Sequence, residues 1–304
     1  MTRPSLRSAM NAERPLVTPL AHDALSARLI ERAGFRAFAI GGWAMLAARF
    51  ALPDIGLAAL GEMTEGIRDI AAASALPFFA DGDDGYGDVK SVARTIEYYE
   101  RVGVGAILIE DQRREGKQPR AERAKSVVDM DEMARKLRAA MGARQDPDTL
   151  IVGRTDAYGA LGLDAAIERA ERFLELGVDS VFVAGLKAEH EYERVGRKLH
   201  GATLSAAIFE GVDTPWITPA ALGAMGYSHV SFPATLIFRA VGVMQQTLQA
   251  LRRHADGLET MAPAEHSERS RAILDDALDL PRWQRIEAEG APSGNAVPFT
   301  SDRS

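Results

Sequence analysis

Short apolar runs alternate with amphipathic segments along most of the chain. Eight of these runs are apolar at successive positions, which is typical of parallel strands that are covered on both faces. We expect strands at residues 16–21, 35–41, 77–81, 105–111, 150–156, 180–185, 203–208 and 229–234.

The segments between these runs carry the signals of helix ends. Asp23, Asp88 and Thr218 each stand directly before a helical pattern, where a side-chain oxygen can cap the first turn. Gly34 and Gly103 follow two of the patterns and are expected to end them. Eight strand–helix units in succession predict an α/β fold, the (β/α)8 or TIM barrel. A doubly wound open sheet is the alternative, but no Gly-x-Gly-x-x-Gly motif follows the first strand.

The last part of the chain differs in character from the rest. After Gly242 a long helical pattern continues, and a more charged segment follows it. We therefore expect a barrel domain over residues 1–256, a C-terminal helical extension over 257–290 and a disordered tail over 291–304. The extension is expected to pack against a neighbouring subunit.

Composition narrows the class of protein. The chain has 304 residues, of which 46% are hydrophobic and 26% are charged, and its formal net charge is −7. The negative charge argues against a nucleic-acid partner, and no apolar run approaches the roughly 20 residues that span a bilayer. The first residues lack the apolar centre of a secretory signal, so we expect a cytoplasmic protein without a membrane partner. Because there is no cysteine, disulfides, thiolate metal ligands and a catalytic thiol are excluded.

Acidic residues gather at the predicted strand ends. Asp81 and Asp83 end the third strand, Glu110 ends the fourth, and Asp54 lies in the loop after the second. In a barrel of this kind these strand ends meet at one rim, where active sites lie. Carboxylates brought so close repel one another unless a cation holds them. An all-oxygen ligand set favours Mg²⁺, or Mn²⁺, over Zn²⁺.

Two other aspartates in the stretch FFADGDDGYGD have competing interpretations. Asp88 stands before a helix and is better explained as its cap. Asp84 fits a turn and a cation site about equally well. For Asp81, Asp83 and Glu110 together, cation binding is the better hypothesis.

Several motifs resemble those of one known family. ADGDDGYGD is similar to the Asp-x-Asp-Thr-Gly-Tyr-Gly signature of the isocitrate lyase/phosphoenolpyruvate mutase superfamily, and GAILIEDQ is similar to its Ile-Glu-Asp-Gln strand end. VGRTDAYGALGLDAAIERA and GGWAMLAARFALPDIGLAALGEM resemble two further segments of that family. The resemblance runs in order from about residue 15 to about residue 250.

The resemblance implies a metal centre and an assembly. Mg²⁺ would be bound through Asp81 or Asp83, and Asp54 and Glu110 would hold its waters. The barrel would form a homotetramer, a dimer of dimers, in which paired subunits exchange their final helix.

The resemblance also implies a substrate site. The amides of Gly41 and Gly42 would stabilise an enolate oxygen, and Arg154 would bind a carboxylate or the departing group. An ion pair with Asp156 or Glu110 is the structural alternative for Arg154.

The chain departs from the family at several positions. Lyases of the family carry a Lys-Lys/Arg-Cys-Gly-His loop after the fourth strand, but EDQRREGKQPRAERAKSV stands there. A standard isocitrate lyase or methylisocitrate lyase mechanism is therefore not expected. Gly41 stands where the family usually has serine, and Ala184 and Ala207 stand where lyases have glutamate and asparagine. The pocket is thus expected to be wider and more apolar than usual, with Trp43 near its floor.

The chemistry that remains is bond cleavage beside a pyruvate-type enolate. We expect a Mg²⁺-dependent lyase or decarboxylase that breaks a carbon–carbon bond in a 2-oxo or 2-hydroxy di-acid, with Arg154, Glu110 and Tyr86 as catalytic candidates. Phosphorus–carbon chemistry on a phosphonopyruvate-like substrate and a non-catalytic metabolite-binding protein are the alternatives. Cations on the loop after the fourth strand are expected to close over the small carboxylate substrate or to form a solvated surface: Arg113, Arg114, Lys117 and Arg120.

Overall fold

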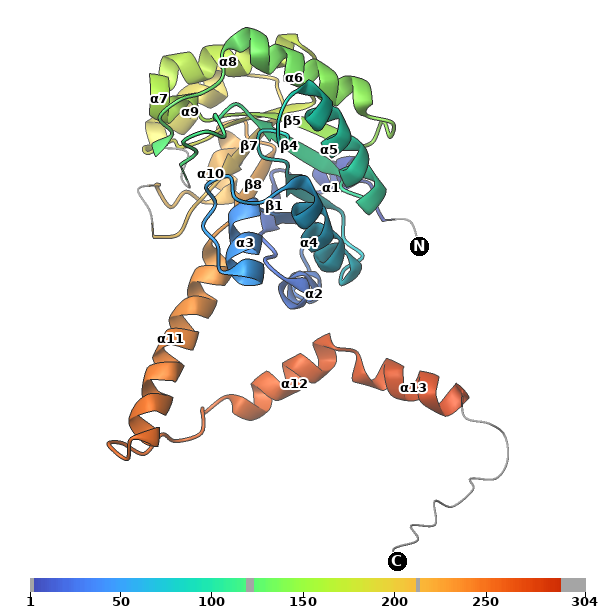
Figure 1. Ribbon diagram of the computed structural model, residues 1–304, viewed down its shortest axis with the longest axis vertical. Helices are drawn as coiled ribbons and strands as arrows, with labels where there is room; N and C mark the ends of the chain where they lie inside the picture. Colours follow the sequence, from blue (N-terminus) through green and yellow to red (C-terminus); the bar gives the residue numbers. More distant parts are fainter. Residues whose placement is uncertain (1–2, 119–122, 212–213, 291–304) are drawn as a thin grey trace, which may run out of the picture. The chain divides into compact units, whose positions relative to one another are not determined.

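A computed structural model of the chain describes residues 3–118, 123–211 and 214–290. At its centre are eight parallel strands, with helices around them (Figure 1). Each strand lies within a run that the hydrophobic pattern predicts. The strands are β1 (Leu16–Pro19), β2 (Phe38–Ile40), β3 (Phe78–Asp81), β4 (Ala106–Glu110), β5 (Leu150–Thr155), β6 (Ser180–Val183), β7 (Leu204–Ala207) and β8 (His229–Phe232).

The sheet closes on itself. Neighbouring strands follow the order β1-β8-β7-β6-β5-β4-β3-β2. A parallel bridge between Leu20 and Ala39 joins the chain after β1 to β2, where the amide of Ala21 donates to the carbonyl of Ala39 at 2.8 Å. The strands therefore form a TIM barrel, and the predicted fold class is confirmed.

Helices surround the barrel because the chain returns along its outside after each strand. Asp23, Asp88 and Thr218 accept hydrogen bonds from first-turn amides of α2, α5 and α10, so the three predicted caps are confirmed. The helices of this part are α1 (Leu6–Ala12), α2 (Ala24–Arg32), α3 (Gly42–Phe50), α4 (Leu60–Ala72), α5 (Val89–Val102), α6 (Met130–Ala143), α7 (Ala157–Leu161), α8 (Leu163–Glu175), α9 (Glu189–Lys198) and α10 (Pro219–Ala224).

Alternate residues of the strands belong to two different buried clusters. Phe38 and Phe78 stack with ring centroids 5.1 Å apart and pack in one cluster with residues of the surrounding helices, such as Ile67. Their neighbours Ala39 and Phe79 belong to the other cluster. Since successive side chains of a strand point to opposite faces, the second cluster fills the inside of the barrel and supports the rim above it.

A histidine is buried inside the barrel. The ring of His229 stacks on Phe79 with centroids 3.9 Å apart. Its nitrogens lie 2.8 Å from the Thr18 hydroxyl and 3.1 Å from the Ser205 hydroxyl. Burial lowers the pKa of His229 to about 3, so the ring is neutral near pH 7.

The C-terminal part is a second compact unit, which begins at Ala250. Long helix α11 (Thr235–Ala255) enters it, and α12 (Ser267–Ala277) and α13 (Leu280–Gly290) lie within the stretch expected to be a helical extension. The tail at 291–304, expected to be disordered, lies outside the described residues. Among the helices of the described ranges, none combines the length and the apolar character that a membrane span requires.

Candidate active site

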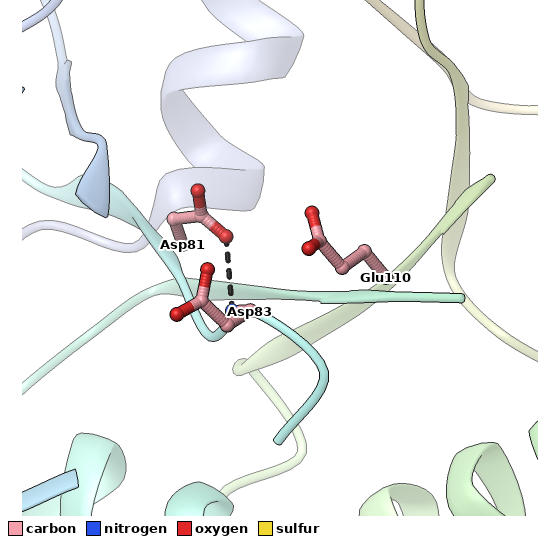
Figure 2. Close-up of side chains that lie close together, drawn as sticks. All are labelled: Asp81, Asp83 and Glu110. Carbon is pink, nitrogen blue, oxygen red and sulfur yellow. Dashed lines mark hydrogen bonds between the residues drawn. The ribbon is translucent and has the colours of Figure 1, made fainter. Parts of the chain in front are cut away.

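Three carboxylates converge at the rim of the barrel. Asp81 ends β3, Asp83 follows two residues later, and Glu110 ends β4 (Figure 2). One oxygen from each lies within 4.8 Å of the others. Asp83 has a φ of +50°, and its amide donates to Asp81 Oδ1 at 3.0 Å. Only glycine fits at position 82, because a Cβ there would lie 2.7 Å from the carbonyl oxygen of Leu108.

Burial makes the charged forms of these carboxylates less favourable. Loss of water raises the pKa of Asp81, and the nearby Asp83 raises it further. Burial also raises the pKa of Asp83 to about 6, against the opposing effect of Lys117. For Glu110 burial acts in the same direction, but Lys117 and Arg154 outweigh it and the net pKa is lowered. The site therefore keeps negative charge near pH 7 and attracts a cation.

The ammonium group of Lys117 supplies such a cation in this structure. It lies 3.2 Å from Asp54 Oδ1 and 3.1 Å from Glu110 Oε1, and it donates a hydrogen bond to Asp83. Lys117 is only 8% exposed. The sequence predicted that a cation holds these carboxylates, but it assigned Lys117 either to a loop that closes over the substrate or to a solvated surface, and not to a position among the acids.

The loop that carries Lys117 is tied to the strand end. Gln112 accepts a hydrogen bond from the Gln118 amide at 2.7 Å and donates to Asp156 Oδ2 at 3.0 Å. Gly116 has a φ of +75°, which lets the chain turn toward the cluster. These contacts bring Lys117 back to the rim within a short stretch of chain.

The donor set also fits a divalent metal. Both Glu110 oxygens are buried and accept no hydrogen bond of good geometry, although Lys117 and Arg154 lie within ion-pair distance of them. Lone pairs of such oxygens remain available to a cation. Three carboxylates within a few ångströms are the hard ligands that Mg²⁺ and Mn²⁺ prefer. Asp54 lies beside them through its contact with Lys117.

Arg154 stands at the end of β5, next to the acids. The β4–β5 register pairs Glu110 with Arg154. Its guanidinium contacts both oxygens of Asp156 at 3.1 and 3.3 Å, Glu110 Oε2 at 3.3 Å and Asp81 Oδ2 at 3.8 Å. The ion pairs weighed as a structural alternative are thus present. Arg154 nevertheless lines the main cavity, where it can meet a ligand.

The glycines of the predicted oxyanion site begin helix α3. A Cβ at Gly42 would lie 3.8 Å from Asp81 Oδ2 and 3.9 Å from Asp83 Oδ1. Gly41 is the N-cap residue and brings no side-chain cap. Since the first amides of a helix have no acceptor within it, this end of α3 offers donors beside the carboxylates.

Asp84 and its neighbours have a supporting role. Asp84 accepts a hydrogen bond from Arg114 at 3.2 Å, and Lys136 lies 3.5 Å from its other oxygen. Arg114 also donates to the carbonyl of Gly56 at 2.9 Å. Asp84 Oδ1 also accepts a hydrogen bond from the Tyr86 amide at 3.1 Å, a contact typical of a turn, so the structure favours the turn interpretation of Asp84. Arg113 pairs with Glu132 at 3.9 Å on the surface, and Arg120 lies outside the described residues.

The main cavity opens beside the acidic cluster and has a volume of about 330 Å³. It lies within the barrel unit. The predicted residues Trp43, Asp54, Asp81 and Arg154 line it, and so do the small residues Ala184 and Ala207. The other lining residues are Ala47, Leu52, Pro53, Phe182, Val183, Gly185, Leu186, Tyr192, Phe209, Thr214 and Phe238.

Tyr86, the predicted acid/base, is placed apart from this cavity. Its hydroxyl lies 2.9 Å from the hydroxyl of Tyr99, which donates to the Asp81 carbonyl at 3.1 Å. Its ring packs under Arg114, 5.3 Å away, and lines a neighbouring cavity. Burial, and secondarily Tyr99, raises the pKa of Tyr86 well above its usual value.

Comparison with known proteins identifies similar chains and folds. Residues 6–252 match the phosphoenolpyruvate phosphomutase family. The 2,3-dimethylmalate lyase of Eubacterium barkeri is 35% identical over 251 residues, which cover 83% of this chain and 86% of the relative. The structure of oxaloacetate acetylhydrolase in complex with the product oxalate matches with a TM-score of 0.84 and 27% identity, over 94% of this chain and 97% of that chain. Phosphonopyruvate hydrolase in complex with oxalate and Mg²⁺ matches with a TM-score of 0.80 and 26% identity, over 95% and 99%.

Proposed function

Because the chain belongs to the phosphoenolpyruvate phosphomutase family, within the isocitrate lyase/phosphoenolpyruvate mutase superfamily, we propose that it is a metal-dependent lyase. It breaks a carbon–carbon bond beside a pyruvate-type enolate in a 2-oxo or 2-hydroxy di-acid. The observation that carries this proposal is the position of Arg154 and the buried acids at one end of a ligand-sized cavity. The names of two matched proteins, a lyase and an acetylhydrolase, support it.

The metal would be held by Asp81, Asp83 and Glu110, with Asp54 beside them. When bound, Mg²⁺ polarises the 2-oxo or 2-hydroxy oxygen and stabilises negative charge that develops there. The amides at the start of α3, which begins beside these carboxylates, would add to that stabilisation.

Arg154 binds the second carboxylate of the substrate. Its side chain is held by Asp156, so the planar guanidinium is already oriented before the ligand arrives. A carboxylate fixed there aligns the bond that breaks with the oxo group at the metal end. Asp156 itself is a buried acid whose pKa is raised to about 7 by burial, against the opposing effect of Arg154.

The enolate or carbanion that is left when the carbon–carbon bond breaks must take up a proton. In a 2-oxo di-acid the carboxyl group leaves as CO₂ and the third carbon of the enolate takes a proton. In a 2-hydroxy di-acid the hydroxyl proton is lost, and the carbon beside the other carboxylate takes one. The loop carries no cysteine, and Tyr86 lies apart from the cavity with its hydroxyl against Tyr99, so water delivers this proton. A Tyr86→Phe variant is then expected to keep its turnover, and loss of turnover would assign the proton to Tyr86.

The experiment is an assay of the purified chain with Mg²⁺. Oxaloacetate and 2-hydroxy di-acids with alkyl substituents are incubated separately, and products are identified by proton NMR. Asp83→Asn and Arg154→Gln variants and a chelator serve as controls, because free metal also decarboxylates oxaloacetate. Product formation above the Asp83→Asn control supports the proposal. If every di-acid remains intact while Mg²⁺ still binds, the lyase proposal is rejected and the non-catalytic alternative gains support.

The likeness to phosphonopyruvate hydrolase favours a second candidate, cleavage of a phosphorus–carbon bond. On the described part of the loop, however, Arg113 and Arg114 pair with protein carboxylates. We therefore place this candidate second. Phosphonopyruvate belongs in the same assay, with phosphorus NMR as the readout of inorganic phosphate.

We also propose that the chain forms a homotetramer, as a dimer of dimers. Several large apolar side chains on α11 are exposed, including Val243 at 63% and Leu248 at 63%. On α13, Trp283 and Ile286 are exposed as well. Exposed apolar groups of this extent on soluble helices favour contact with another copy. Light scattering after size-exclusion chromatography is expected to give about four times the chain mass of 32.8 kDa.

A further inference from the structure

The main cavity is polar at one end and apolar over the rest of its wall. Among the described residues that line it, the charged side chains are Asp54, Asp81 and Arg154. Asp81 belongs to the acidic cluster, Arg154 contacts it, and Asp54 is joined to it through Lys117. Two uncharged hydroxyl-bearing residues, Tyr192 and Thr214, also contribute to the wall. Hydrocarbon forms most of the remainder.

The apolar part is built from rings and short side chains. Trp43 meets Phe238 edge to face, with ring centroids 5.6 Å apart and planes at 63°. The Arg154 guanidinium lies over the Phe182 ring, 5.6 Å from its centroid. Ala184 follows β6 and Ala207 ends β7, and both are buried in the wall. Because these two side chains are a single methyl group each, they leave room where longer ones would fill the space.

The charges limit how many carboxylates a ligand can carry here. The oxo-acid end of the ligand is taken up at the acids and the metal, and Arg154 can match one further carboxylate. A third carboxylate directed into the apolar part would lose its hydration without gaining a cationic partner among the described lining residues, which is unfavourable. A hydrocarbon group in the same place gains affinity, by about fourfold for each buried methylene.

We propose, on the basis of the proposed function, that the substrate is a 2-oxo or 2-hydroxy di-acid with a bulky hydrocarbon substituent. This branched or aromatic group is attached to the carbon next to the oxo or hydroxy carbon. It occupies the cavity between Trp43, Phe182, Phe209 and Phe238. The enzyme thus selects substituted di-acids over tricarboxylates and over unsubstituted di-acids.

The test is a binding comparison that does not require turnover. In the presence of Mg²⁺, calorimetry measures Kd for 2-oxoglutarate and for 3-isobutyl-2-oxoglutarate, which keeps both carboxylates and adds a branched group to the carbon next to the oxo carbon. The branched ligand is expected to bind at least tenfold more tightly. A series from pyruvate through 2-oxobutyrate to 2-oxohexanoate is expected to gain about fourfold per methylene. Equal or tighter binding of 2-oxoglutarate, or a flat series, overturns the inference.

Two variants connect the preference to this wall. Ala207→Leu fills the apolar part and is expected to weaken binding of 3-isobutyl-2-oxoglutarate at least tenfold, while Kd for oxalate stays within about twofold. Leu52→Asn changes a lining residue that is 39% exposed and need not disturb the core. It is expected to weaken the branched ligand by about fivefold. Leu57→Asn, on the same loop but outside this cavity, is the matched control. If both lining variants leave the preference unchanged, the substituent does not bind here.

The outcomes separate this inference from the proposed function. An apolar preference in binding, with no cleavage of any substituted di-acid, retains the inference about the ligand and rejects the lyase reaction. Cleavage of oxaloacetate, with no gain in affinity from the branched group, retains the lyase reaction and rejects the inference about the substituent.

Discussion

Replacing Lys117 with glutamine is expected to tighten Mg²⁺ binding. The Lys117 ammonium lies 3.1 Å from Glu110 and 3.2 Å from Asp54, and it is hydrogen-bonded to Asp83. A metal held by Asp83 and Glu110 would therefore share their oxygens with this ammonium. Either the two cations repel each other, or the loop must move and give up its ion pairs. Both possibilities weaken the binding of the metal.

The magnitude follows from charge and distance. A single positive charge and a divalent ion about 4 Å apart repel by about 2 kcal/mol even at the dielectric constant of water, and by more in a buried site. Two kcal/mol corresponds to about a 30-fold change in Kd. We therefore expect Lys117→Gln to bind Mg²⁺ at least about 30-fold more tightly than the unmodified chain.

Isothermal titration of Mg²⁺ at pH 8 and low salt measures this change directly. At that pH, above the raised value of about 6 for Asp83, the carboxylates are ionised in both proteins. Arg113→Gln is the matched control, because Arg113 lies on the same loop but pairs with Glu132 at the surface. An Asp83→Asn variant should lose Mg²⁺ affinity. If folded Lys117→Gln bound Mg²⁺ as weakly as the unmodified chain, the ammonium and the metal would occupy separate positions and the reasoning would be wrong.

Three further predictions concern the substrate site and the barrel. Arg154→Lys removes the planar fork and is expected to lower kcat/KM for the di-acid about 100-fold, or about 3 kcal/mol, with Mg²⁺ affinity unchanged by titration. The pKa of His229 is 6.5 in the unfolded chain and about 3 in the folded chain. Between these two pH values His229 is protonated mainly when the chain is unfolded, so the folded state loses stability as the pH falls. The stability deficit of His229→Gln, measured by urea unfolding, should therefore shrink by about 2 kcal/mol from pH 7 to pH 5, and a constant deficit would contradict this. Gly196→Ala would place a Cβ 1.9 Å from the Met225 carbonyl oxygen and should cost about 3 kcal/mol of unfolding free energy. Gly142→Ala, with nothing within 4 Å, should not destabilise its helix.

The strands and the acidic residues could be predicted because their signals are local. A strand covered on both sides needs a continuous apolar run, and residues at its carboxyl end must meet the rim of a closed barrel. The proximity of Asp81, Asp83 and Glu110 could therefore be predicted from their positions in the sequence alone. The helix caps at Asp23 and Asp88 are equally local.

The position of Lys117 and the cavity wall depend on contacts far apart in sequence. The path of the loop is set by Gln112, Gln118 and Asp156 together, and no short pattern encodes that arrangement. A weak signal did exist, since Lys117 directly follows Gly116 and lies only seven residues after Glu110. The sequence predicted a more apolar pocket from Ala184 and Ala207, but the wall also includes Leu52 and Phe238, whose approach to each other depends on the folded chain.

Asp83 and Asp84 are adjacent in sequence but contact different side chains. Asp83 faces the cation site, whereas Asp84 is bound by Arg114 and Lys136. Gly82 fixes this arrangement, because its close approach to the Leu108 carbonyl leaves no space for any other residue. Deleting one residue between β3 and Asp83 would move Asp84 to the position of Asp83, and Arg114 and Lys136 would lose their carboxylate partner. This segment should therefore tolerate a change of length much less well than an exposed turn such as residues 145–148.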